Sequence, residues 1–134
     1  MGYIDRVRKL LIILIGLVAF TVAGCSSSGT ATSVGPTEFE QLTQQPGVVV
    51  LDVRTPGEFA SGHLPNAVNL DVESPTFATG LSQLDPDATY AVYCRSGNRS
   101  KVALEQMNDA GITKAQDLDG GIVGWQAEGL PVVQ

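Results

Sequence analysis

The sequence predicts an α/β domain with a mainly parallel sheet. Short apolar runs alternate with segments that begin at helix-capping residues, which is the pattern of strands joined by crossover helices. The run at 48–53, VVVLDV, is nearly all apolar and β-branched, so we expect an interior parallel strand covered on both faces. A length of 134 residues suits one such domain.

Two helix-capping patterns begin the first half of the predicted domain. Thr37 and Glu40 have capping-box spacing and predict a helix that continues to about Gln45. Thr55 and Glu58 repeat this spacing and predict a second, shorter helix. We also expect a short strand at 67–70 and a helix that begins at Ser74-Pro75, with Phe77, Leu81 and Leu84 on one face.

The second half continues the alternation of strands and helices. We expect strands at 90–93 and 115–118, the second with a weaker pattern, and helices at 100–110 and 122–129. Gly111 is placed to close the first of these helices. The cysteine that follows the strand at 90–93 should lie beyond the carboxyl end of the sheet, where ligands bind in such folds.

The loop at 94–99, CRSGNR, is the most informative stretch. A cysteine at a strand end that faces a helix N-terminus lies among backbone amides and a positive dipole, which favour the thiolate. Arg95, Arg99 and Lys101 stand where a first helical turn usually carries acidic residues, and a thiolate and an anionic substrate would offset their charge. The sequence therefore predicts a reactive thiolate that works on a small anion, with a solvated basic turn as the alternative.

Residues 1–24 have the organisation of a secretion signal. Basic residues precede an apolar stretch at 10–23, which is short for a membrane span and suits the core of a signal peptide. VAGC at 22–25 resembles the lipobox of bacterial lipoproteins, and the resemblance implies cleavage before Cys25 and lipid on that cysteine. An uncleaved anchor helix is the alternative.

We expect the small polar residues of 25–36 to form a flexible tether and 37–134 to form the folded domain. The protein would then be anchored to the cell membrane by lipid, with its domain outside the cytoplasm, in the periplasm or on the outer face. Cys94 would have no partner in the chain, which suggests reactivity. A disulfide between Cys25 and Cys94 is the alternative if lipidation fails.

Charge narrows the class of partner. The leader contains 3 of the 8 basic and 1 of the 14 acidic residues, which leaves 5 and 13 and a net charge of −8. This acidic body argues against nucleic acid or anionic lipid as a partner, whereas the basic residues at the cysteine loop favour a small anion. One histidine and one free cysteine do not make the usual metal-ligand set, so we expect neither a metal nor another cofactor.

Three stretches resemble the rhodanese-like (sulfurtransferase) domain family. They are LDVRTPGEFASGHLPNAVNL at 51–70, CRSGNR at 94–99 and LDGGIVGWQAEGLPV at 118–132. The resemblance implies a five-stranded parallel sheet with helices on both faces. It also implies that Cys94 takes sulfane sulfur from a donor such as thiosulfate, becomes a persulfide, and passes the sulfur to a thiol, cyanide or protein acceptor.

The resemblance also implies roles by position within the loop. Cys94 is the nucleophile, the amides of 95–99 form a cradle, and Gly97 permits the tight turn. Arg95 and Arg99 hold the anion or close the loop, and Arg99 counts with Cys94 as catalytic. We assign substrate binding to Arg95, Ser96, Gly97, Asn98 and Ser100.

Two other function classes stay open. Phosphatases and arsenate reductases of related design hold an oxyanion in a loop one residue longer than the stretch between Cys94 and Arg99, so the shorter ring favours one sulfur atom. A non-catalytic sulfur carrier or protein-binding module is also compatible with the acidic surface.

Four residues outside the cysteine loop have expected roles. Asp52 is either a partner of a loop arginine or a cap of the following turn. We expect Arg54 and Glu58 to form a local pair and His63 to have a structural or rim role.

Overall fold

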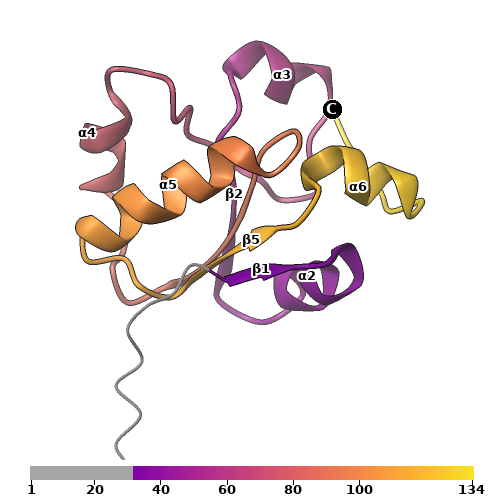
Figure 1. Ribbon diagram of the computed structural model, residues 1–134, viewed down its shortest axis with the longest axis horizontal. Coiled ribbons are helices and arrows are strands. Elements are labelled where there is room, and N and C mark those ends of the chain that lie inside the picture. The colour runs from indigo at the N-terminus through magenta and orange to yellow at the C-terminus, as the bar shows by residue number, and fades with distance from the viewer. Residues whose placement is uncertain (1–31) are drawn as a thin grey trace, which may run out of the picture.

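The computed structural model describes residues 32–134, in which five strands form one sheet with the order β1-β5-β4-β2-β3 (Figure 1). Every neighbouring pair is parallel, as predicted. The strands are β1 Thr32–Val34, β2 Val48–Asp52, β3 Val68–Asn69, β4 Thr89–Tyr93 and β5 Ala115–Leu118. The helices are α2 Pro36–Thr43, α3 Pro56–Ser61, α4 Phe77–Leu81, α5 Asn98–Asp109 and α6 Gly121–Ala127.

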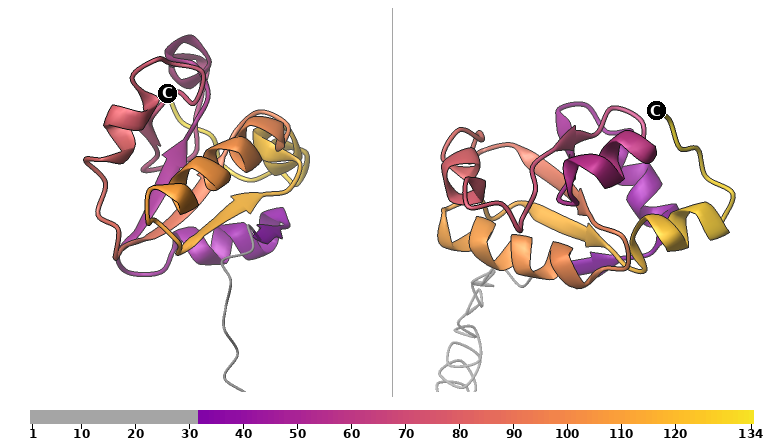
Figure 2. Two further views of the ribbon diagram at one scale, coloured as in Figure 1. Left: turned by 60° about the vertical axis from the view of Figure 1, so that its left-hand side comes forward. Right: turned by 90° about the horizontal axis from the view of Figure 1, so that it is seen from above.

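Helices cover both faces of the sheet, with α5 and α2 on opposite sides (Figure 2). Successive side chains of a strand point to opposite faces. Val92 of β4 therefore joins a hydrophobic core with residues of α4 and α5, whereas Tyr93 joins a second core with residues of α2 and α6. Cys94 continues the alternation and belongs to the first core, under α5.

The helix starts show which capping patterns form. The capping box of Thr55 and Glu58 is present at the start of α3, as predicted. The capping box expected at Thr37 is wrong, because α2 begins at Pro36 with Gly35 before it and no side-chain cap. Proline at the first helical position needs no amide partner and sets the φ angle of a helix, so it can begin α2 without a hydroxyl cap.

Strand β1 lies in the segment that was expected to be a tether. Thr32, Ser33 and Val34 pair with Gln116, Asp117 and Leu118 of β5. The tether expected at 25–36 therefore does not reach 36, and the fold begins before the expected boundary at 37. A short edge strand with polar side chains has no apolar run, which is why its sequence resembles a linker.

The remaining boundaries differ from expectation by a few residues. Helix α4 begins at Phe77, not at the Ser74-Pro75 pair, and α5 begins at Asn98.

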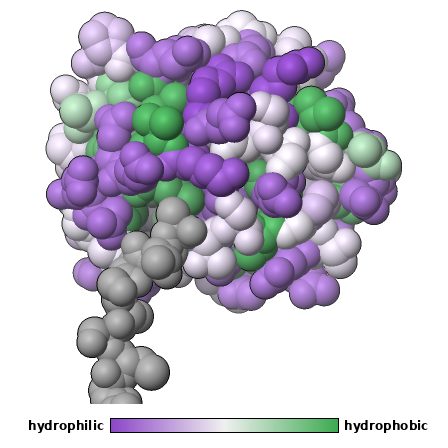
Figure 3. Space-filling model, viewed as in Figure 1, coloured by the Kyte–Doolittle hydropathy of each residue, from purple (hydrophilic) through white to green (hydrophobic). Residues whose placement is uncertain are grey.

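The surface shown in Figure 3 is mostly hydrophilic, and its apolar side chains lie in separate places. Among residues 32–134, no helix combines the length and apolar character needed to cross a bilayer. The leader and Cys25 lie outside the described residues.

Candidate active site

Cys94 follows β4 directly, in a loop that leads from the end of that strand into α5. Gly97 immediately precedes α5 and has a φ of 103°, a left-handed conformation that disfavours any side chain. Its amide donates a hydrogen bond to Cys94 Sγ at 3.0 Å. The strand end and the helix start thus place one sulfur atom against the N-terminus of α5.

The surroundings of Cys94 favour its thiolate. Burial acts to raise the pKa of Cys94, because an anion is poorly solvated inside a protein. The Ser100 hydroxyl and the amides of Ser100, Gly97 and Ser96 outweigh burial, so that the net pKa of Cys94 is lowered. The first turn of α5 contains no acidic residue, so no carboxylate of that turn competes with the sulfur for the positive end of the helix dipole.

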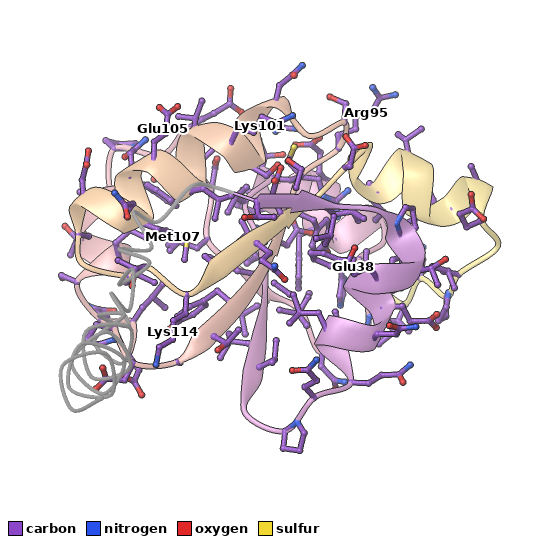
Figure 4. All side chains as sticks on the ribbon, turned by 60° about the horizontal axis from the view of Figure 1, so that its bottom comes forward. Glu38, Arg95, Lys101, Glu105, Met107 and Lys114 are labelled. Atoms are coloured by element: carbon purple, nitrogen blue, oxygen red, sulfur yellow. The ribbon has the colours of Figure 1, made fainter. Side chains whose placement is uncertain are left out.

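The sulfur lies at the bottom of the loop. Cys94 is 1% exposed, whereas Arg95, Ser96 and Asn98 are exposed around it. Figure 4 shows Arg95 beside the loop and Lys101 on the first turn of α5 along one edge of the molecule, with Lys114 well away from both. A reagent must approach through the ring of loop atoms, which admits one projecting atom more easily than a bulky group.

Helix α6 braces the loop from the other side. The Ile122 amide donates to the Cys94 carbonyl at 2.9 Å, and the Val123 amide donates to the Arg95 carbonyl at 3.2 Å. Gly121 permits this approach: a Cβ atom there would overlap the Arg95 carbonyl and lie 2.6 Å from the Cys94 carbonyl oxygen. The Gly120-Gly121 pair therefore helps to set the shape of the cysteine loop.

Arg99 bridges the loop to α3. Its guanidinium donates to both carboxylate oxygens of Glu58 at 2.8 Å, and to Glu73 at 3.3 Å. Hydrogen bonds from Arg99 are the main reason that the pKa of Glu58 is lowered to about 2. Of the two roles expected for Arg99, this geometry supports closing the loop. Because Glu58 binds Arg99, the expected pair of Arg54 with Glu58 is wrong.

Asp52 and Arg54 form a buried ion pair beneath α3, with Arg54 Nη2 2.7 Å from Asp52 Oδ2. Asp52 also accepts from the Arg54 amide at 2.9 Å and from the Tyr93 hydroxyl at 2.6 Å. Its hydrogen bonds within residues 32–134 include none from a loop arginine, so the turn-capping alternative is confirmed and the pairing with Arg95 or Arg99 is wrong. Arg54 donates further to the Gly62 carbonyl at 2.7 Å, which fastens the end of α3.

His63 has a structural role. Its Nδ1 lies 2.9 Å from the Phe59 carbonyl oxygen and donates to it, and its ring stacks on that of Phe59 with centroids 3.8 Å apart. The His63 amide donates to the Val133 carbonyl at 2.9 Å, and the Val133 amide donates to the His63 carbonyl at 2.8 Å. His63 thus connects the C-terminal segment to α3, and none of these contacts involves the cysteine loop.

Ser100 and Asp117 form a buried polar cluster behind the sulfur. Cys94 Sγ lies 3.6 Å from Ser100 Oγ, and the Ser100 hydroxyl lies 2.8 Å from Asp117 Oδ2. Ser33 of β1 donates to the other Asp117 oxygen at 2.5 Å. Sequence reasoning missed Asp117, because it lies in a weakly patterned strand. A signal was present, since an acidic residue in an otherwise buried strand needs hydrogen-bond donors.

A cavity of about 260 Å³ opens beside the loop, between α3 and α6. Its wall combines charged or polar groups with apolar ones, namely Arg54, Glu58, Ser61, Gly62, Arg95, Ile122, Val123, Gln126 and Val132. Residues 32–134 contain no cluster of side chains that could hold a metal ion. The arrangement is thus a buried cysteine whose pKa is lowered by loop amides and the Ser100 hydroxyl, with a mixed pocket beside the loop.

Comparisons with known proteins agree with this geometry. The family model for the rhodanese-like domain matches residues 35–128. The thiosulfate sulfurtransferase GlpE of Pseudomonas syringae is 34% identical over 91 residues, which cover 68% of this chain and 84% of that protein. An uncharacterized Synechocystis protein is 39% identical over 112 residues, which cover 81% of this chain and 60% of that longer protein.

A solved structure shows the same architecture. The crystal structure of a rhodanese-related protein from Thermoplasma volcanium superimposes with a TM-score of 0.68 at 33% sequence identity. The match covers 76% of this chain and 97% of that one. The five-stranded parallel sheet with helices on both faces is therefore the fold of this family.

The close approach at Gly121 predicts a large effect of a small substitution. Gly121→Ala should destabilise the protein by about 3 kcal/mol or more and slow alkylation of Cys94, because the new methyl group must push the loop carbonyls away. Gly120→Ala is the matched control, since its Cβ would meet Gly124 Cα at an ordinary 3.6 Å and adds only left-handed strain. Equal losses of stability in urea denaturation would contradict the bracing role of α6.

The pair of Arg99 with Glu58 predicts a pH-dependent part of stability. Because folding lowers the pKa of Glu58 to about 2, its contribution is full above the unfolded pKa near 4.5 and is lost as the pH falls through 2. Glu58→Gln keeps the capping box and should lower the free energy of unfolding at pH 7 by about 0.5–1 kcal/mol. The loss should shrink between pH 5 and 2. Glu73→Gln, at the longer and more exposed contact, serves as control, and a loss in Glu58→Gln independent of pH would refute the ionic account.

Proposed function

The chain belongs to the rhodanese-like domain family, which includes sulfurtransferases, and we propose that it transfers sulfane sulfur through a persulfide on Cys94. The observation that carries this proposal is the buried Cys94 Sγ with the Gly97 amide 3.0 Å away, at the N-terminus of α5. That position favours a thiolate and can also stabilise the negative charge of a bound sulfur. Relatives named as sulfurtransferases match most of the described residues.

The first half of the reaction uses the thiolate as a nucleophile. Cys94 attacks the outer sulfur of a donor such as thiosulfate, and a new sulfur–sulfur bond forms while the old one breaks. The electron pair of the broken bond leaves with sulfite, and the outer sulfur of the Cys94 persulfide retains the negative charge. Amides of the loop that faced the thiolate then face the persulfide.

The second half returns the sulfur to an acceptor. A thiolate or cyanide attacks the outer sulfur, the bond to Sγ breaks, and the electron pair stays on Cys94 as its thiolate. The charge is the same before and after, so this half needs no proton. The cavity between α3 and α6 can receive the rest of a donor, a thiol or a segment of a protein acceptor next to Arg95.

Charge and access favour a small anionic donor. Arg95, Lys101 and Arg99 stand at the loop of a domain whose net charge is otherwise acidic, which concentrates attraction for anions at one place. Arg99 already binds Glu58, so Arg95 and Lys101 are the groups that a donor meets first. A 1% exposed sulfur suits the transfer of one projecting atom and disfavours the attack on a bulky phosphate group.

We also propose that lipid on Cys25 anchors the domain outside the cytoplasm. The tether would then be residues 26–31, since β1 begins at Thr32, and would reach about 20 Å at full extension. The chain enters β1 at the amino end of the parallel strands, whereas Cys94 follows the carboxyl end of β4. The reactive loop would therefore face away from the point of attachment, open to a soluble donor or partner.

Loading with sulfur tests the reaction class. After incubation with thiosulfate, the purified chain should gain the mass of one sulfur atom, and Cys94→Ser should gain none, because the persulfide forms on Sγ. Intact-protein mass spectrometry, with and without a reducing thiol, makes the measurement. Hydrolysis of an aryl phosphate without sulfur gain would move the protein to the oxyanion class. Neither activity in a folded chain would favour the binding module.

Anchoring has a separate test. Cys25→Ala should release the domain from the membrane fraction, because lipid is attached to that sulfur. Ser28→Ala, in the same short segment, is the matched control and should leave the protein with the membranes. Fractionation and immunoblotting provide the readout, and retention of Cys25→Ala in the membranes would favour an uncleaved helix.

A further inference from the structure

The Ser100 hydroxyl has one proton to donate and lies near two oxygen acceptors and Cys94 Sγ, which donates to Ser100 as a thiol and can accept as a thiolate. Its Oγ is 2.8 Å from Asp117 Oδ2, 3.1 Å from the Gly97 carbonyl oxygen and 3.6 Å from Cys94 Sγ. When the proton points to Asp117, Ser100 offers the sulfur only a lone pair, which suits a thiol. When the proton points to Sγ, Ser100 stabilises a thiolate.

Asp117 is placed to compete for that proton. It lies in β5 with 0% exposure, and its two oxygens accept from Ser100 and Ser33, which come from α5 and β1. None of the ion pairs among residues 32–134 includes Asp117. A buried carboxylate without a cation depends on its hydrogen-bond donors, so it attracts the Ser100 proton strongly.

We propose that Asp117 is a positioning residue that competes with Cys94 for the proton of the Ser100 hydroxyl, and so sets how basic and how nucleophilic the sulfur is. The hydroxyl turns toward Sγ when the thiolate is free and turns back to Asp117 when the sulfur is protonated or carries a second sulfur atom. No bond to carbon or sulfur changes in this motion, which is a rotation about the Cβ–Oγ bond of Ser100.

The charged groups around Cys94 divide into two sides. At the mouth of the loop, Arg95, Arg99 and Lys101 are basic, and Glu58 reaches the loop from α3 through its pair with Arg99. Helices α4 and α6 contain no titratable side chains, and Asp52 of β2 is bound to Arg54. Asp117 is therefore the acidic group behind the sulfur, where it opposes the cations in front.

This arrangement has a consequence for reactivity. A thiolate with a very low pKa is abundant but weakly nucleophilic, since nucleophilicity falls as basicity falls. Because the Ser100 proton must leave Asp117 to reach the thiolate, part of the stabilisation is lost, and the thiolate stays more basic than the amide ring and an uncontested Ser100 hydroxyl would make it. The inference rests on the proposed function only in taking Cys94 as the reacting group.

Alkylation of Cys94 by iodoacetamide tests the competition without any sulfur donor. The rate is followed as a function of pH on the Cys94 peptide of the full-length chain by mass spectrometry. Asp117→Asn has the same shape but lacks the charge, and its amide can donate to Ser100 Oγ. Its pH midpoint should fall by about 0.5–1 unit. Its plateau rate at high pH should fall about two- to threefold, because a less basic thiolate is a weaker nucleophile.

Three further single variants and one double variant test the direction of the shift in the midpoint. Ser100→Ala removes the donor to the thiolate, so its midpoint should rise by about 0.5 unit, and adding Asp117→Asn to it should shift the midpoint less than in the native background. Asp119→Asn removes one charge at an exposed position of the same segment and should leave both quantities unchanged. If Asp117→Asn does not fold, Asp117→Thr replaces it. The threonine hydroxyl can bond to Ser33 and Ser100 but has no charge, so the midpoint should again fall.

The competition is overturned if Asp117→Asn, or Asp117→Thr in its place, leaves the midpoint unchanged or raises it. It is also overturned if Asp117→Asn shifts the midpoint as far in Ser100→Ala as in the native chain, since the effect would then not pass through the hydroxyl. Failure of sulfur loading with thiosulfate, alongside the expected alkylation profiles, would refute the proposed function and leave this inference standing.

Discussion

The hydrogen bond from the Gly97 amide to Cys94 Sγ, 3.0 Å long, is the interaction on which the site depends. It forms because Gly97 adopts a left-handed conformation between β4 and α5, which points the first amides of the helix at the end of the strand. An anion at this point satisfies amides that a helix leaves without partners. Burial would otherwise favour the neutral thiol, so the ring of donors decides the protonation state of the sulfur.

The surrounding elements keep that loop in shape. Helix α6 holds two loop carbonyls through its first amides, and α3 holds Arg99 through Glu58. The buried pair of Asp52 with Arg54 in turn fixes the chain on either side of α3. Each of these contacts acts on backbone or on a charged side chain rather than on the sulfur itself. The side chains of Arg95 and Lys101 take no part in these contacts, so under the proposed function they are the cations that can attract an anionic donor.

Local sequence patterns predicted the parts of the fold that have strong local signals. The apolar run at 48–53, the capping box at Thr55 and the cysteine before a helix all lie where expected, and the family resemblance added the number of strands. Strand β1 could not be predicted, because its polar residues gain order from pairing with β5. The roles of Glu58 and Asp117 depend on partners distant in sequence, Arg99 and Ser33, which no spacing rule connects.

Persulfide formation by the proposed route requires the Cys94 thiol to ionise more readily than an ordinary cysteine thiol, because of the donors around it. The most direct measurement is the ultraviolet absorbance of the thiolate as a function of pH, taken as the difference between the native chain and Cys94→Ser so that Cys25 cancels. We expect a midpoint below the value of about 8.5 for an ordinary cysteine, because the surrounding donors lower the pKa of Cys94. A midpoint at or above that value in the folded protein would contradict this expectation.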